Sequence, residues 1–436
     1  MNLEQTRIHC LSCGTFHPAD YVEIDGAAFW RVHCPKGDRD VGISSDARLF
    51  RKFRNQAQPL PDWYRRSFTN CLVHVNDDCS LQCPVCFENA PRHGWRMSLE
   101  ELRKTAHFLR TKVKPVNIMI TGGEPTEHPQ ILDIVRVIAR KCGFHCSILT
   151  NGVKIGRDPG FAASLKEAGL ARVTLSFDTF RPEVSEVIRG RGDLVDLKLS
   201  AIENCDAAEL NCGLETTACR LNLQEIPKMA AFSIARAGRM TMYDVQCYQP
   251  SGRIVPGLES VDREEIVKTM VASGVVPGLT EEEFRVSPCI PAMGYCLNPD
   301  CAAYVLWTVK NGVAEPITRT CDYDGLLSDL YRMPPGSRVS KRLGFGLAFL
   351  RRLGLRRLLA LHKSLRYSSV GGEHLQMFSI SNLMTPGRLD CHRFGRCFSG
   401  VVTLNGKICP PCYYYGMRFH DVRKARSGAT REGVSV

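Results

Sequence analysis

The chain has 436 residues, of which 44% are apolar and 23% charged, with 21 cysteines and a formal net charge of +12. This composition excludes a disordered or low-complexity chain, and the length predicts two or three structural units. The sequence lacks an uncharged apolar run of the roughly 18 residues that a membrane-spanning helix needs. Its first residues lack the apolar core of a secretory signal. We therefore expect a cytoplasmic protein whose clustered thiols bind metal or do redox chemistry, with an anionic partner.

Residues 70–250 alternate short β-type runs with helical patterns. The expected strands span 71–75, 116–121, 146–150, 172–177, 213–218 and 243–247. The expected helices span 98–112, 129–142, 159–169, 194–210 and 225–237, the first opening with a capping box from Ser98 to Glu101. Six such steps predict an α/β fold with a parallel sheet and helices outside it. Polar and Pro-containing segments at 55–62 and 332–340 indicate linkers on either side.

Two motifs follow strands of this sheet directly. Cys79, Cys83 and Cys86 have the spacing Cys-x3-Cys-x2-Cys, and three thiolates on one loop can hold three irons of a 4Fe–4S cube and leave the fourth open. Gly122 and Gly123 open a Gly-Gly-Glu-Pro turn in which the backbone can approach a ligand closely. The carboxyl ends of parallel strands share one rim, so both motifs are expected together there. The alternative for the cysteines is a zinc knuckle with a distant fourth ligand.

With these motifs and Leu-Thr-Asn-Gly at 149–152, the chain resembles the radical S-adenosylmethionine (SAM) superfamily over about residues 70–250. The resemblance implies a partial (β/α)6 barrel at residues 60–260, with the 4Fe–4S cluster on Cys79, Cys83 and Cys86. It implies reductive cleavage of SAM to a 5′-deoxyadenosyl radical, with electrons from a flavodoxin or ferredoxin. The residues expected to bind SAM or substrate are Gly122, Gly123, Glu124, Pro125, Asn151, Ser176 and Asp178. One departure is Val85, where many members carry an aromatic residue; Phe87 follows instead.

Further motifs resemble the radical SAM family that contains tetraether lipid synthase and enzymes described as pterin methyltransferases. They are CPVCFENA, TGGEPTEHPQ, LTNGV, Arg189-Gly190 and QPSGR at 249–253. This resemblance implies a rubredoxin-like segment at residues 1–58 that holds one iron or zinc ion through Cys10, Cys13 and Cys34. The histidine that usually trails the third cysteine is missing, so His9, His17 and His33 are the options for a fourth ligand. The cysteine run that usually precedes the main triplet is reduced to Cys71.

The remaining residues, 261–436, carry two further cysteine groups. The resemblance implies auxiliary 4Fe–4S clusters, and the candidate ligands are Cys289, Cys301, Cys397, Cys409 and Cys412, with Cys391 as a companion. Residues 396–415 fit a hairpin that presents cysteines at both ends. Structural zinc is the alternative for both groups.

Residues 341–366 combine leucines at helical spacing with arginines. This pattern predicts a basic amphipathic helix, which suits an anionic bilayer surface. The alternative is a helix packed on the barrel with a solvated arginine face. Nucleic acid is not expected, because aromatic residues are not interleaved with the arginines.

Together these features predict a radical SAM enzyme that functionalises an unactivated sp3 C–H bond by C–C coupling or methylation. A lipid chain is the preferred substrate, with peripheral association at the inner face of the membrane. One alternative is methylation of a pterin or other small heterocycle. A second is a metal-stabilised binding protein without catalysis.

Overall fold

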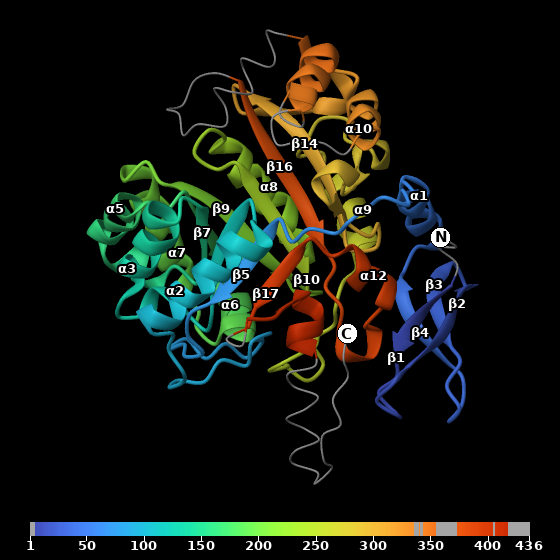
Figure 1. Cartoon of the computed structure of the whole chain (residues 1–436), viewed down its shortest axis with the longest axis horizontal. Coiled ribbons are helices and arrows are strands. Elements are labelled where there is room, and N and C mark those ends of the chain that lie inside the picture. Colours follow the sequence, from blue (N-terminus) through green and yellow to red (C-terminus); the bar gives the residue numbers. More distant parts are fainter. Residues whose placement is uncertain (1–4, 335–339, 341–342, 355–372, 404–405, 417–436) are drawn as a thin grey trace.

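The computed structural model describes the chain except residues 1–4, 335–339, 341–342, 355–372, 404–405 and 417–436. The N-terminal segment is a four-stranded antiparallel meander, shown in blue in Figure 1. Its strands are β1 (Gln5–His9), β2 (Phe16–Ile24), β3 (Ala27–Val32) and β4 (Arg39–Ser44), and helix α1 (Ala47–Asn55) follows. Ile8, Ala19, Trp30 and Val32 form its small core.

The centre of the molecule is a curved parallel sheet with helices on its outer face (Figure 1). Its strands run in sequence order: β5 (Asn70–His74), β6 (Asn117–Thr121), β7 (His145–Thr150), β8 (Arg172–Ser176), β9 (Asn211–Ala218) and β10 (Met242–Cys247). The helices between them are α2 (Leu99–Phe108), α3 (Ile131–Val135), α4 (Val153–Arg157), α5 (Pro159–Ala168), α6 (Pro182–Arg189), α7 (Leu194–Ala207) and α8 (Ile226–Ala235). This arrangement confirms the predicted α/β barrel, and the capping box from Ser98 to Glu101 is present.

Alternate residues of each strand pack outward against the helices. Ile118, Ile120, Val173 and Leu214 belong to one large apolar core that also contains helix residues such as Ile202. Burial of this outer strand face stabilises the barrel, and the intervening residues face the lumen. On β8, β9 and β10 these inward positions include the polar residues Ser176, Glu215 and Asp244, whereas on β5, β6 and β7 they include Leu72, Met119 and Leu149.

The C-terminal region adds strands to both edges of this sheet. β16 (Glu373–Ser381) pairs in parallel with β10, and β17 (Ser399–Val402) pairs in parallel with β5. β14 (Ala302–Lys310) runs antiparallel to β16. β11 (Arg285–Val286) and β15 (Val313–Pro316) each pair antiparallel with β14. β17 also forms the predicted hairpin with β18 (Ile408–Cys409). β16 and β17 thus extend the barrel sheet at both of its edges.

Helices α9 (Arg263–Ser273), α10 (Tyr323–Tyr331) and α12 (Cys391–Arg396) lie in this region. A short hairpin also forms here, in which β12 (Cys289–Ile290) pairs with β13 (Tyr295–Cys296). The predicted basic helix is described at residues 343–354, and the rest of 341–366 lies outside the described residues. Phe345 and Phe349 pack against the core formed with α10, and Arg352 forms ion pairs with Asp322 and Asp329. Within the described part of the chain, none of the helices has both the length and the apolar character to cross a bilayer.

Candidate active site

The three cysteines of the predicted cluster motif lie on one loop after β5. Cys79 and Cys83 are each 8% exposed, and they share an apolar cluster with Leu81 and the partly buried Cys86. Burial raises the pKa of the Cys79 thiol to about 12 and also raises the pKa of Cys86. Thiols with such raised pKa values ionise readily only beside a positive centre, so the loop suits an iron–sulfur cluster that supplies this charge.

Hydrogen bonds from two side chains fix the shape of this loop. Arg253 Nε donates to the carbonyl oxygen of Cys83 at 2.8 Å, and Arg253 Nη1 donates to that of Ala90 at 2.8 Å. Gln82, in a left-handed conformation with φ of 52°, donates its amide to the carbonyls of Cys79 and Ala90. The loop is therefore held by groups from outside the cysteine motif as well as within it.

Val85 and Phe87 lie in different surroundings. Val85 is buried with Val184 and Ile188. Phe87 instead meets the ring of Tyr415 edge to face, with centroids 5.1 Å apart. The cluster loop thus contacts the C-terminal cysteine segment through these two rings.

The glycine pair after β6 allows close approach to the loop after β5. A Cβ atom on Gly122 would lie 2.4 Å from Asn76 Oδ1, and one on Gly123 would lie 2.2 Å from the carbonyl oxygen of Asp78. The two backbones are joined by hydrogen bonds from Gly123 N to Asn76 O and from Glu124 N to Asp78 O. Only glycine fits here, because any side chain would separate the two loops.

The carboxylate of Glu124 is occupied within the protein. Its Oε1 accepts from Thr126 N at 3.0 Å and from Thr150 Oγ1 at 2.6 Å, and its Oε2 accepts from Asn151 N at 2.7 Å. Glu124 is 2% exposed, and burial raises its pKa. This side chain therefore ties the end of β6 to the end of β7. Pro125 is buried and begins the 3₁₀ turn that follows.

The other predicted SAM or substrate contacts also gather at this rim. Asn151 Nδ2 lies 4.0 Å from Cys79 Sγ, and the main-chain oxygen of Ser176 accepts a hydrogen bond from Lys198. Asp178 accepts Arg189 Nε at 2.6 Å and Arg189 Nη2 at 2.8 Å. Burial opposes ionisation of Asp178, but Arg189 lowers its pKa. Asp178 is therefore engaged in a buried ion pair.

Two cations beside the cluster loop were not identified as site residues from the sequence. Burial disfavours a charged Arg189, but Asp178 and Cys83 outweigh this effect and raise its pKa. Burial lowers the pKa of Lys198 to about 8, despite the charge of Asp178. Both cations can attract the carboxylate of an amino acid bound at the rim. The sequence clue was Arg189-Gly190, which the family resemblance had included as a motif.

Two carboxylates in the barrel lumen were also not identified as site residues from the sequence. Glu215 on β9 and Asp244 on β10 are register partners on adjacent strands. Asp244 accepts hydrogen bonds from Ser379 at 2.5 Å and from Ser381 at 3.1 Å, both on β16. The available clue was an acidic residue within each of two expected strands of a buried parallel sheet, where charged side chains are costly.

The N-terminal cysteines form a compact group. The sulfur of Cys34 lies 3.5 Å from that of Cys10 and 3.9 Å from that of Cys13. A tetrahedral ion with metal–sulfur bonds of about 2.3 Å places its thiolates about 3.8 Å apart, so the spacing suits one ion of iron or zinc. His17 Nε2 is 2.9 Å from Cys13 Sγ, whereas His33 is held by Asp20 and Asp38. The third option, His9, directs Nδ1 to the carbonyl oxygen of Pro386.

The C-terminal cysteines separate into different environments. Burial raises the pKa of Cys397, and the charges of Cys412 and Cys301 raise it further, so the three thiols influence one another electrostatically. Arg393 donates Nε to Cys301 Sγ at 3.2 Å. These three thiols could share one auxiliary cluster. Burial alone raises the pKa of Cys409, to about 11, and that of Cys391 is raised by burial and by Asp390.

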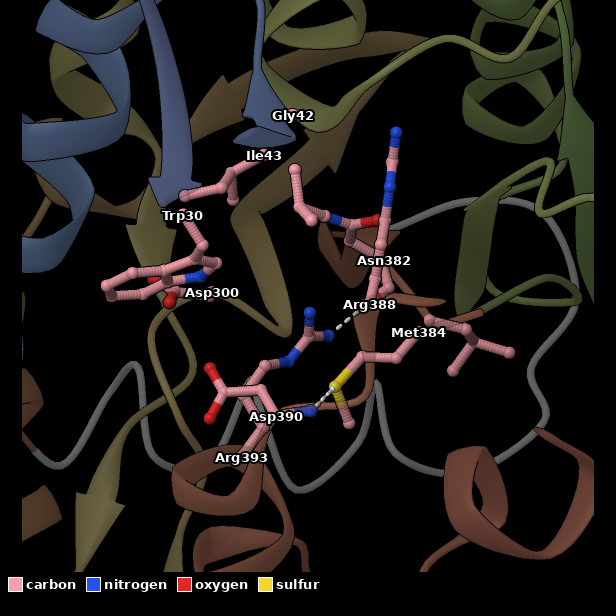
Figure 2. Close-up of a pocket in the computed structure, with 11 residues that line it drawn as sticks. Trp30, Gly42, Ile43, Asp300, Asn382, Met384, Arg388, Asp390 and Arg393 are labelled. Carbon is pink, nitrogen blue, oxygen red and sulfur yellow. Dashed lines mark hydrogen bonds between the residues drawn. The ribbon is translucent and has the colours of Figure 1, made fainter. Parts of the chain in front are cut away.

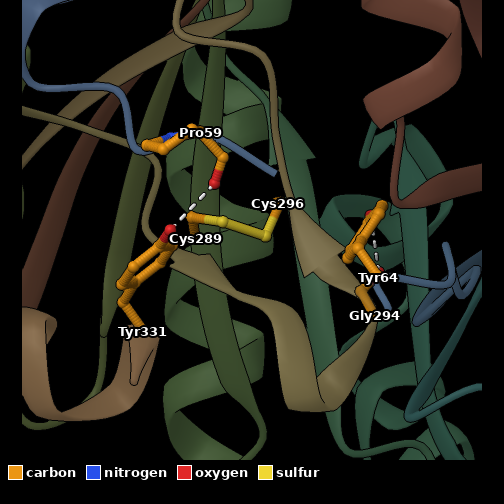
Figure 3. The surroundings of a disulfide bond; sticks show 6 residues. All are labelled: Pro59, Tyr64, Cys289, Gly294, Cys296 and Tyr331. Atoms are coloured by element: carbon orange, nitrogen blue, oxygen red, sulfur yellow. Dashed lines mark hydrogen bonds between the residues drawn. A yellow bond between two sulfur atoms is a disulfide. The ribbon is translucent and has the colours of Figure 1, made fainter. Parts of the chain in front are cut away.

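Cys289, which was expected to bind a metal, forms a disulfide in the structure. It is joined to Cys296 in a disulfide across the short β12–β13 hairpin (Figure 3). The two residues are direct register partners, which brings their side chains together. In this state the sulfur of Cys289 is not available to a cluster.

A small cavity of about 30 Å³ lies where the N-terminal meander meets the C-terminal region (Figure 2). Trp30 and Ile43 line one side, and Met384 and Arg393 line the other. The interface is fixed nearby by a hydrogen bond of 2.5 Å from Thr6 to Asp390. The N-terminal metal segment is therefore docked beside the group of Cys301, Cys397 and Cys412.

Comparison with known proteins agrees with this geometry. Residues 73–232 match the Radical SAM superfamily. The chain is 25% identical to a 7,8-dihydro-6-hydroxymethylpterin dimethyltransferase of Methanocaldococcus jannaschii, over 95% of this chain and 94% of that protein. It is 28% identical to a GTP 3′,8-cyclase of Nitrobacter hamburgensis over 44% of this chain, and it spans 57% of that cyclase.

Among solved structures, methylornithine synthase (PylB) aligns with 51% of this chain and 67% of its own, with 18% identity and a TM-score of 0.39. The family match and the curated relatives, which are named as enzymes, favour an enzyme over a metal-stabilised binding protein. Residues 73–232 form a radical SAM domain, and this chain is a radical SAM enzyme.

Proposed function

We propose that this enzyme functionalises an sp3 C–H bond of a small, polar heterocycle, with methylation of a reduced pterin as the reaction. The observation that carries the proposal is the polar lumen formed by β8, β9, β10 and β16, with Glu215 and Asp244 at its centre. Packing the methylenes of a lipid chain against such carboxylates would remove water from them without compensation. The M. jannaschii relative, which is similar over nearly the whole chain, acts on a pterin.

The residues of the rim fit the cofactors of this family. Cys79, Cys83 and Cys86 would hold three irons of the 4Fe–4S cluster, and the close backbone approach at Gly122 and Gly123 would shape the place for the methionine end of SAM. When bound, the cluster and SAM supply a primary carbon radical that removes hydrogen from an unactivated C–H bond. Arg189 and Lys198 would attract the carboxylate of SAM, and Glu124 would hold the ends of β6 and β7 in position.

The test measures 5′-deoxyadenosine from anaerobically reconstituted enzyme with SAM and dithionite. Addition of 7,8-dihydro-6-hydroxymethylpterin should raise production above the substrate-free rate, whereas vesicles of anionic phospholipid should not. The variant with Cys79, Cys83 and Cys86 changed to alanine should give none. Stimulation by the vesicles and not by the pterin would contradict the proposal.

One observation favours a lipid as a second candidate substrate. Leu343, Leu347 and Leu350 on the helix at 343–354 are exposed by 64%, 66% and 42%. Such an apolar stripe beside arginines suits a membrane surface. Cosedimentation of the holoenzyme with anionic vesicles tests it, and Leu347→Glu should abolish the binding. An unchanged pellet with Leu347→Glu would exclude this helix as the contact.

A further inference from the structure

One row of lumen residues crosses four neighbouring strands. Ser176 on β8 is the register partner of Glu215 on β9, which pairs in register with Asp244 on β10, and Asp244 pairs with Ser379 on β16. Adjacent residues in one row of a sheet lie about 5 Å apart and point to the same face. The row therefore presents two carboxylates between two hydroxyl groups.

The alternation of β9 places Glu215 on the lumen side. Its neighbours in sequence, Leu214 and Thr216, are fully buried, and Leu214 belongs to the core under the helices. Thr216 Oγ1 donates to the carbonyl oxygen of Phe177. Glu215 must therefore point the other way, toward Asp244 and the interior of the barrel.

The two carboxylates differ in their partners. Asp244 is held by Ser379 and Ser381, as described above. Glu215 accepts no hydrogen bond from any residue that the structure describes. Burial, with a further contribution from Asp244, raises the pKa of Glu215 to about 8. Arg189 does not fill this gap, because its side chain donates to Asp178 and Thr217 and also interacts with the thiol of Cys83.

Other buried polar atoms on or just after these strands also lack partners in the described part of the chain. Thr174 lies two residues before Ser176 on the same face of β8, and its Oγ1 is fully buried without a hydrogen bond. Gln249 follows β10, is 6% exposed and leaves Oε1 without a donor, while its amide is held by Asn382. Buried polar groups normally find partners, so these atoms leave hydrogen-bonding capacity unused near the inner ends of β8 and β10.

The position of Glu215 relates this space to the radical site. Arg189 lowers the pKa of Glu215 electrostatically, and the same Arg189 interacts with the thiol of Cys83. Glu215 thus lies within electrostatic range of an arginine that interacts with the cluster loop. A ligand bound by Glu215 would lie in the lumen beneath the rim where SAM is proposed to bind.

We propose that Glu215 selects the substrate by accepting two adjacent N–H donors, such as the ring N–H and amino group of a 2-amino lactam. This inference rests on the proposed function and specifies which edge of the heterocycle Glu215 recognises. An ionised carboxylate is an acceptor with two oxygens, and it pairs with two parallel N–H groups in a bidentate geometry. The carboxylate of Asp244, which accepts hydrogen bonds from Ser379 and Ser381, places further acceptor oxygens beside Glu215.

The test compares 7,8-dihydro-6-hydroxymethylpterin with the corresponding lumazine, in which an oxo group replaces the 2-amino group. Binding is measured by equilibrium dialysis against the anaerobic holoenzyme with SAM and without reductant, so that no turnover occurs. The wild type should bind the pterin about 10- to 100-fold more tightly, because the lumazine places a carbonyl oxygen against a carboxylate oxygen. Glu215→Gln presents one donor and one acceptor, and should reverse this preference.

Two controls separate recognition from folding. Glu215→Asp keeps two acceptor oxygens and should keep the preference for the pterin, with weaker binding. Glu203→Gln, an exposed position on α7, should match the wild type. An unchanged preference in Glu215→Gln, with wild-type affinity for the pterin, would overturn this inference and leave the proposed function standing. Absence of binding of either heterocycle to the wild type would overturn both.

Discussion

Arg253 binds the main-chain oxygens of Cys83 and Ala90, two residues of the same cluster loop, each at 2.8 Å. Cys86 and Arg253 are also joined as a backbone bridge. An arginine in a loop after β10 therefore sets the conformation of a loop after β5. The motif that carries the cysteines depends on a side chain about 170 residues away.

Loss of this arginine should reduce cluster occupancy. Arg253→Gln removes two hydrogen bonds from a charged donor, each contributing about 1.5–3 kcal/mol, and frees the loop to move. We expect lower iron and sulfide content after anaerobic reconstitution, with circular dichroism close to that of the wild type. Arg103→Gln, an exposed position on α2, is the matched control. Equal iron content in both variants would show that Arg253 does not hold the loop.

Substrate affinity should rise with pH toward 8. Glu215 has a pKa of about 8, and only its ionised form accepts two donors. Affinity for the dihydropterin should therefore fall about tenfold for each pH unit below that pKa. The charged groups that act on Glu215 are Asp244, Arg189 and Asp178.

The same measurement on Glu215→Gln should give a flat profile between pH 6 and about 8. A slope that persists in this variant would assign the dependence to another group. Lys198, whose pKa is also about 8, would then be the first to test.

One metal ion should bind in the N-terminal segment through three thiolates and His17. Purified protein should contain one iron or zinc there, and Cys34→Ala should remove it with a loss of thermal stability. His17→Ala should weaken the metal affinity more than His33→Ala, because His33 is held by two aspartates. The spectrum of the cobalt-substituted protein reports the ligands. An identical spectrum for His17→Ala and the wild type would exclude His17.

An auxiliary cluster at Cys301, Cys397 and Cys412 should be separable from the radical cluster. Changing all three to alanine should remove about four irons per chain and leave the EPR signal of the Cys79, Cys83 and Cys86 cluster. Changing Cys289 and Cys296 to serine is the control and should leave the iron content unchanged, since these two residues form a disulfide. Loss of iron in the control would place the auxiliary ligands at the β12–β13 hairpin instead.

The order of the barrel strands could be read from the sequence because it depends on local patterns. Apolar runs such as Val116–Thr121 and the glycines that follow them are contiguous, and consecutive βα units pair with their neighbours. The pairing of β16 and β17 with the barrel could not be read in this way, since the partners lie more than 100 residues apart. The hairpin of β17 and β18, a local feature, was predicted correctly.

The same difference between local and long-range features decides which parts of the site could be predicted. The cysteine and glycine motifs were recognisable because their chemistry depends on spacing within a few residues. The environment of Glu124 depends on Thr150 and Asn151 at the end of another strand, so its role within the protein was not apparent. Glu215 and Asp244 were overlooked because their importance comes from facing one lumen, which only the register of β9 and β10 reveals.

The two added edge strands bear on how this protein can be shortened. A fragment ending near residue 260 would leave the backbone amides and carbonyls of β5 and β10 exposed along open edges, and such edges pair with other chains. That fragment should self-associate, although it contains every residue matched by the family. The smallest piece that folds by itself therefore has to reach at least to the end of β17, at Val402.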